Sequence, residues 1–183
     1  MSKRGNGRRV ITGGLAGISL LATAIVVSPS TPLANDVVNG DFGTGDGAGW
    51  NIYGGAFAVE DGFGCLSIAD GVGPYGAAFQ QRLRLEPDTD YVLSFDAKVP
   101  AGTATSVTVV VQLPRDPFTG YLTPQAIAAQ LGSDVTSFEY TFTTPSELPP
   151  ADVGGPADGP NASVEFQHTA SGAAAYQLCL DNV

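Results

Sequence analysis

The chain has 183 residues, of which 18 are acidic and 8 are basic, so its net charge at neutral pH is −10. Such an acidic chain is poorly suited to neutralising nucleic-acid phosphates or to docking on an anionic membrane surface. Hydrophobic residues make up 43% of the sequence, which excludes a disordered chain. The 24 glycines and 13 prolines indicate many turns and few helices.

The N-terminus has the pattern of a secretion signal peptide. Residues 1–9 carry four of the eight basic side chains, and residues 10–27 form an apolar run. That run is at the lower limit for a membrane span, so a retained anchor is the alternative. We predict a signal peptide over residues 1–34 and a single module over residues 35–183. The module should be extracellular and free of the membrane, with a net charge of about −14, because four basic and 18 acidic residues remain.

The sequence contains two cysteines, Cys65 and Cys179, and one histidine, His168. In an oxidising compartment the two cysteines are expected to form one disulfide, and two buried free thiols are the alternative. A zinc site is not expected, because the chain has no C-x-x-C motif and no cluster of Cys and His. His168 alternates with apolar residues and is expected in the core.

The body of the chain is dominated by short segments in which apolar and polar residues alternate. This period of two is typical of strands with one buried face. Only residues 123–131 are compatible with a short helix, and residues 144–160 form a long loop rich in Pro, Gly and acidic residues. The pattern predicts an all-β fold, an antiparallel β-sandwich of the jelly-roll type with a concave binding face. The predicted strands are 79–85, 91–98, 105–113, 138–143, 162–168 and 176–180.

The second side of several strands is unusual for a solvated surface, because it is rich in amides and medium-sized apolar groups. Amide groups donate and accept hydrogen bonds at once, which suits sugar hydroxyls, and aromatic rings suit the apolar face of a pyranose. We therefore predict a surface for a neutral, hydroxyl-rich chain; the alternative is that glutamines are simply tolerated on exposed strands. The side chains assigned to this surface are Phe79, Gln81, Val110, Gln112 and Gln167, with Ser163 and Glu165 on the same side as Gln167.

Four stretches in order resemble the jelly-roll carbohydrate-binding modules of families four and nine, which are attached to bacterial glycanases. The stretches are VVNGDF (37–42), GWNIYGG (49–55), the L-x-L-E-P-D-T-D-Y-V-L-S-F segment (83–95) and YQLCLDNV (176–183). Within this group, the chain resembles the N-terminal cellulose-binding modules of actinobacterial family-nine endoglucanases. Those modules also have one cysteine before the third strand and one in the last strand.

The resemblance implies a binding site. It assigns one aromatic wall to Tyr53 and a second to Phe118, with Tyr121 as a nearby substitute. Two positions differ from the family pattern: Val110 stands where some relatives have an arginine, and Glu165 where a small apolar residue is common. The floor of the site is assigned to Gln81 with Phe79, to Val110 and Gln112, and to Gln167.

The resemblance also implies a structural calcium ion remote from the sugar site. Its ligands would be Asp41, the carbonyl of Gly62, and Asp181. Oxygen ligands from separate segments suit Ca²⁺. The alternative is that Asp41 and Asp181 only cap turns.

These features predict a monomeric, non-catalytic module that holds single β-glucan chains in a cleft. The ligand would be amorphous cellulose, a cello-oligosaccharide or a related β-glucan or xylan, and the module would target an attached glycoside hydrolase. A secreted jelly-roll glycanase or polysaccharide lyase that uses Glu165 is one alternative, and a structural or adhesion domain is another. The sequence has no G-x-S-x-G or H-E-x-x-H motif to support catalysis.

Overall fold

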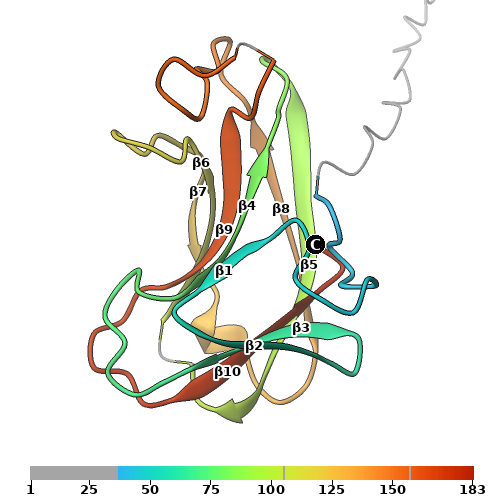
Figure 1. The fold of residues 1–183 in the computed structure, drawn as a ribbon, viewed down its shortest axis with the longest axis vertical. Coiled ribbons are helices and arrows are strands. Elements are labelled where there is room, and N and C mark those ends of the chain that lie inside the picture. The colour runs from blue at the N-terminus through green and yellow to red at the C-terminus, as the bar shows by residue number, and fades with distance from the viewer. Residues whose placement is uncertain (1–36, 105, 157) are drawn as a thin grey trace, which may run out of the picture. The chain divides into compact units, whose positions relative to one another are not determined.

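The computed structural model describes residues 37–104, 106–156 and 158–183, all within one compact unit, Pro32–Val183 (Figure 1). The predicted signal peptide lies outside the described residues. Within the described part, no helix combines the length and apolar character needed to cross a membrane.

The described chain forms two five-stranded antiparallel sheets, which confirms the all-β sandwich prediction. The first sheet, sheet A, has the strand order β1-β4-β9-β6-β7, and the second, sheet B, has the order β2-β3-β10-β5-β8. Sheet A contains β1 (Asn51–Tyr53), β4 (Ala78–Leu83), β6 (Val107–Gln112), β7 (Gly120–Ala126) and β9 (Ala162–His168). Sheet B contains β2 (Gly55–Glu60), β3 (Phe63–Ile68), β5 (Asp90–Gly102), β8 (Thr136–Thr143) and β10 (Tyr176–Asp181).

The core lies between the two sheets and is built from the apolar side of each strand. Phe166 of β9 meets Phe95 of β5 edge-to-face, with ring centroids 4.8 Å apart, so the sheets pack directly on each other. Trp50 is 9% exposed, and its indole N–H donates to the Asn39 carbonyl at 3.1 Å. Burying a large apolar side chain stabilises the fold by about 1.5–3 kcal/mol, so these rings anchor the sandwich.

His168 is a core residue, as predicted. It is 1% exposed, its Nδ1 lies 2.9 Å from the Tyr176 hydroxyl and its Nε2 lies 3.1 Å from the Val72 carbonyl. Burial raises the pKa of Tyr176 to about 12. The imidazole therefore links β9, β10 and the β3–β4 loop.

The helix considered for residues 123–131 is mostly wrong. Residues up to Ala126 belong to β7, and only a short 3-10 turn, Ala128–Gln130, follows. β7 pairs with β6 through Leu122 opposite Val111 and Ala126 opposite Thr108. A short apolar run does not distinguish strand from helix, and here the free edge of β6 provided the pairing partner.

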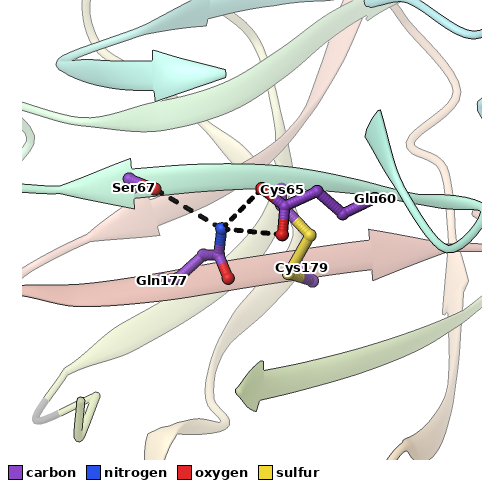
Figure 2. The surroundings of a disulfide bond; sticks show 5 residues. All are labelled: Glu60, Cys65, Ser67, Gln177 and Cys179. Atoms are coloured by element: carbon purple, nitrogen blue, oxygen red, sulfur yellow. Dashed lines mark hydrogen bonds between the residues drawn. A yellow bond between two sulfur atoms is a disulfide. The ribbon is translucent and has the colours of Figure 1, made fainter. Parts of the chain in front are cut away.

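Cys65 and Cys179 form the predicted disulfide (Figure 2). The two residues lie opposite each other on β3 and β10. Their neighbours Leu66 and Leu180 are in the core, so the disulfide lies on the outer side of sheet B. Beside it, the Gln177 side-chain amide donates to the Glu60 carboxylate at 3.2 Å.

Candidate functional site

The outer face of sheet A is the surface on which the sequence predicted ligand-binding groups. Strand pairing sets its rows, because Gln80 of β4 lies opposite Glu165 of β9, which in turn lies opposite Val110 of β6. Side chains directly opposite on adjacent strands share a face. The outward side chains of β1, β4, β9 and β6 are Asn51, Tyr53, Ala78, Gln80, Arg82, Ser163, Glu165, Gln167, Thr108, Val110 and Gln112.

The positions expected for Phe79 and Gln81 on this face are wrong. Phe79 is fully buried and packs edge-to-face against Trp50 at 6.2 Å. Gln81 is 4% exposed and faces inward, where its Oε1 accepts from the Val38 N–H at 2.6 Å and its Nε2 donates to the Val38 carbonyl at 2.9 Å. β4 therefore presents Gln80 outward, because a shift of one residue moves a side chain to the opposite face of a strand.

Glu165 is the hub of a hydrogen-bond network at the centre of this face. It is 4% exposed, and its Oε1 accepts from Gln80 Nε2 at 2.9 Å and from Ser163 Oγ at 2.5 Å. Its Oε2 accepts from Gln167 Nε2. The network continues to β1, where Asn51 Nδ2 donates to Gln80 Oε1 at 2.9 Å. A row of amides and one carboxylate thus runs across β1, β4 and β9.

Two exposed aromatic residues lie at opposite ends of the outer face, as the strand registers show. Tyr53 lies opposite Ala78, which lies opposite Gln167 at one end of the face. Phe118 follows Gln112 in the β6–β7 loop at the other end, and it is 56% exposed. Burial raises the pKa of the Tyr53 hydroxyl, and the nearby Glu165 carboxylate raises it further. Tyr53 therefore lies beside the polar network.

Tyr121 and Tyr75 differ from what the sequence suggested. Tyr121, considered as a substitute for Phe118, is half-buried, and its hydroxyl donates to the Asn161 carbonyl at 3.2 Å. Tyr75 was not singled out, yet it is 63% exposed in the β3–β4 loop. Its N–H donates to the His168 carbonyl at 2.7 Å, which places its backbone next to Gln167. The position of Tyr75 beside sheet A is visible only in the tertiary structure, because a loop has no sequence periodicity from which it could be predicted.

The side chains at the centre of the outer face are buried, whereas the aromatic side chains at its margins are exposed. Val110, Ser163 and Glu165 point outward but are at most 4% exposed, whereas Tyr53 and Phe118 at the margins are well exposed. The β6–β7 and β8–β9 loops lie at one end of sheet A, the upper end in Figure 1.

Two contacts connect the β8–β9 loop to neighbouring segments. Arg82 of β4 forms a salt bridge with Asp152 at 2.7 Å, and Arg115 Nε of the β6–β7 loop donates to the Pro150 carbonyl at 3.1 Å.

The three residues suggested for calcium come from separate segments: Asp41 precedes β1, Gly62 lies in the turn between β2 and β3, and Asp181 ends β10. Burial raises the pKa of Asp181, and the carboxylates of Asp96 and Asp41 raise it further, so Asp41 and Asp181 are near one another. A hollow of about 440 Å³ next to them is lined partly by Asp41 and Asn182. The described residues hold no group of three or more His, Cys, Asp or Glu arranged around a metal position. The two aspartates fit a hard cation as oxygen donors.

Comparison with known proteins identifies a family. Residues 34–153 match the carbohydrate binding domain of families four and nine. No curated protein sequence matches the chain closely enough to count as a relative. A structure of a family-4 carbohydrate-binding module is 31% identical with a TM-score of 0.60, covering 74% of this chain and 92% of that one.

Two further solved structures are similar. The N-terminal cellulose-binding domain of Cellulomonas fimi β-1,4-glucanase C is 28% identical with a TM-score of 0.59, covering 82% of this chain and 95% of that one. A family-16 carbohydrate-binding module is 24% identical with a TM-score of 0.55, covering 81% and 96%, and it shows likeness of fold. The chain belongs to the carbohydrate-binding domain family of types four and nine, and it is a non-catalytic carbohydrate-binding module.

Proposed function

We propose that the outer face of sheet A binds single, neutral β-glucan chains such as amorphous cellulose, cello-oligosaccharides or a related β-glucan or xylan. The observation that carries the proposal is the row of amide and carboxyl groups between two exposed aromatic residues at opposite ends. The similar Cellulomonas fimi domain is described as cellulose-binding, which supports this class of ligand.

In the proposed complex, Tyr53 and Phe118 stack on sugar rings at the two ends of the face. Each stack contributes about 0.5–1.5 kcal/mol beyond the area that it buries. Gln112 and Gln167 exchange hydrogen bonds with equatorial hydroxyls, each contributing about 0.5–1.5 kcal/mol, and Val110 forms an apolar floor. Association costs reduce the total, so dissociation constants between micromolar and millimolar are expected. Gln80 takes the role that the sequence assigned to Gln81.

The biological setting that fits this activity is extracellular. We propose that residues 1–34 direct secretion, that the module works as a monomer, and that it targets an attached glycoside hydrolase to its polysaccharide. N-terminal sequencing of the protein recovered from culture medium would identify the cleavage site. Recovery of the protein only in the membrane fraction would instead indicate a retained anchor.

We also propose that Asp41 and Asp181 contribute oxygen ligands to a structural Ca²⁺ on the side of the module formed by sheet B. The supporting observation is the mutual proximity of these two acidic groups. The ion would neutralise their repulsion and would have no part in sugar recognition.

Affinity electrophoresis tests the proposed ligand. The protein is run in gels that contain hydroxyethylcellulose, mixed-linkage β-glucan, laminarin or xylan, next to Tyr53→Ala and Val92→Ala. Val92 is the matched control, since it is an exposed apolar residue of β5 in sheet B. We expect retardation by at least one β-glucan or by xylan. Loss of the Tyr53 ring should weaken binding about 5- to 100-fold, and Val92→Ala should not change it. Unretarded migration in all four gels would overturn the proposal.

A further inference from the structure

The carboxylate of Glu165 determines how the neighbouring amides are turned. A carboxylate only accepts hydrogen bonds, whereas a side-chain amide has one accepting and one donating end. The amide nitrogens of Gln80 and Gln167 therefore both point at Glu165. The Oε1 atom of Gln167 is turned away from Glu165 as a result, and the Oε1 atom of Gln80 accepts from Asn51.

At the centre of the outer face, this orientation leaves the Oε1 atom of Gln167 and the remaining lone pairs of the Glu165 carboxylate as acceptors. Sugar hydroxyls can donate to such groups, but a carboxylate on a sugar has no proton to donate at neutral pH. At an acceptor of this face, a sugar hydroxyl can therefore donate a hydrogen bond, whereas a sugar carboxylate in the same place cannot.

Among the salt bridges of the described residues, none involves Glu165. The basic outward residue on the adjacent strand, Arg82, is paired with Asp152 at 2.7 Å. The Glu165 carboxylate is 4% exposed, and a charge in such a low-dielectric position acts more strongly on its surroundings than one in water.

We propose that Glu165 is a positioning and specificity-determining residue of the carbohydrate-binding face. It holds the amides of Gln80 and Gln167 in the orientation suited to neutral hydroxyl-bearing chains, and it rejects polysaccharides that carry carboxylates on the sugar units. This inference rests on the proposed function, because it concerns the same face.

The test compares two soluble polymers with the same β-1,4-glucan backbone, neutral hydroxyethylcellulose and anionic carboxymethylcellulose. Affinity electrophoresis gives dissociation constants for the unaltered protein, for Glu165→Gln and for Glu139→Gln. Glu139 is an exposed glutamate of β8 in sheet B, so its substitution changes the net charge equally without touching sheet A. Thermal unfolding checks that each variant is folded. Glu165→Ala is a second neutral variant for the case in which the glutamine variant does not fold.

We expect Glu165→Gln to strengthen binding to carboxymethylcellulose about five- to tenfold at low salt, as expected for removal of one unit charge several ångströms from a ligand charge. Glu139→Gln should change it by less than about twofold, because water and salt screen a distant exposed charge. Glu165→Gln should also weaken binding to hydroxyethylcellulose, because the amides lose their fixed orientation. High salt should reduce the gain in affinity for carboxymethylcellulose, because salt screens charge repulsion. It should not change the loss of affinity for hydroxyethylcellulose.

Equal neutral-to-anionic affinity ratios for Glu165→Gln and Glu139→Gln would overturn the inference while leaving the proposed function intact. A failure of the unaltered protein to bind hydroxyethylcellulose, mixed-linkage β-glucan, laminarin and xylan would instead remove the proposed function. The two failures are therefore distinguishable in one set of gels.

Discussion

The two sheets of the sandwich share a core but differ in what they present to solvent. The outer face of sheet A carries a continuous network of amides around the buried Glu165, between the exposed rings of Tyr53 and Phe118. The outer face of sheet B carries the disulfide and local pairs of short side chains, such as Thr143 Oγ1 to Asp90 at 2.6 Å. Strands with the same alternation thus build the proposed binding face on one side of the sandwich and a disulfide-bonded face on the other.

The largest effect that separates the two faces should come from removing the disulfide with Cys65→Ala and Cys179→Ala together. The bridge closes a loop with a sequence separation of 114 residues, and the chain-entropy model assigns such a loop about 4–5 kcal/mol as an upper figure. Chemical denaturation measures this loss. Polysaccharide binding by the folded fraction should be unchanged, because the bridge is on sheet B. Weaker binding by folded protein would show that the two faces are coupled.

The adjacent glutamines of β4 allow a second comparison, between the outward side chain of Gln80 and the inward side chain of Gln81. Gln81→Ala should lower the free energy of unfolding by about 1–3 kcal/mol, because the Val38 N–H and carbonyl both lose their partner. Gln80→Ala should have a smaller effect on stability, since Glu165 keeps its bonds from Ser163 and Gln167, but should weaken polysaccharide binding. Urea unfolding and affinity electrophoresis of both variants give the two readouts. The reverse pattern would mean that Gln81 is the ligand-facing residue.

The smallest effect is expected at Asp181 on sheet B. Burial raises the pKa of the Asp181 carboxyl group, so the folded protein binds the carboxyl proton more tightly than the unfolded chain does. The stability that this proton provides is present at acidic pH and is lost as the pH rises through the pKa of the folded state. At neutral pH, without calcium, Asp181→Asn should therefore raise the melting temperature by about 1–2 °C after solvent screening.

Calcium should stabilise the unaltered protein and not Asp181→Asn, if Asp181 is a ligand. Thermal unfolding with a chelator and with calcium chloride measures both effects, and polysaccharide binding is the control that should not change. A calcium response that is equal in the two proteins would remove Asp181 from the proposed site.

The sequence predicted those parts of the fold in which local alternation and burial agree. In β6 and β9 the apolar side was continuous, so the outward positions of Val110, Gln112 and Gln167 could be read directly. In β4 the reading failed, because Gln81 is polar but buried and bonded to the backbone of Val38. Polarity alone does not distinguish an amide that faces solvent from a buried amide that bonds to backbone groups, as Gln81 does to Val38.

The residues of the candidate site also divide into those that the sequence assigned to it and those that only the structure placed there. Tyr53 and Phe118 were assigned to the candidate site through the resemblance, and both are exposed. Gln80 and Tyr75 were missed: Gln80 was hidden by the offset of one residue, and Tyr75 lies in a loop that only the contact with His168 brings to sheet A. The helix considered for residues 123–131 became β7 because a neighbouring strand offered hydrogen bonds.

By itself, the sequence determined the class of fold, the disulfide pair and the chemical character of the binding strands, because alternation, composition and cysteine number are properties of the chain. Tertiary structure decided which glutamine of β4 faces outward and which groups meet around Glu165. Strand register sets those neighbours, and register depends on pairing between distant segments: Gln80 of β4 and Glu165 of β9 are 85 residues apart in the sequence.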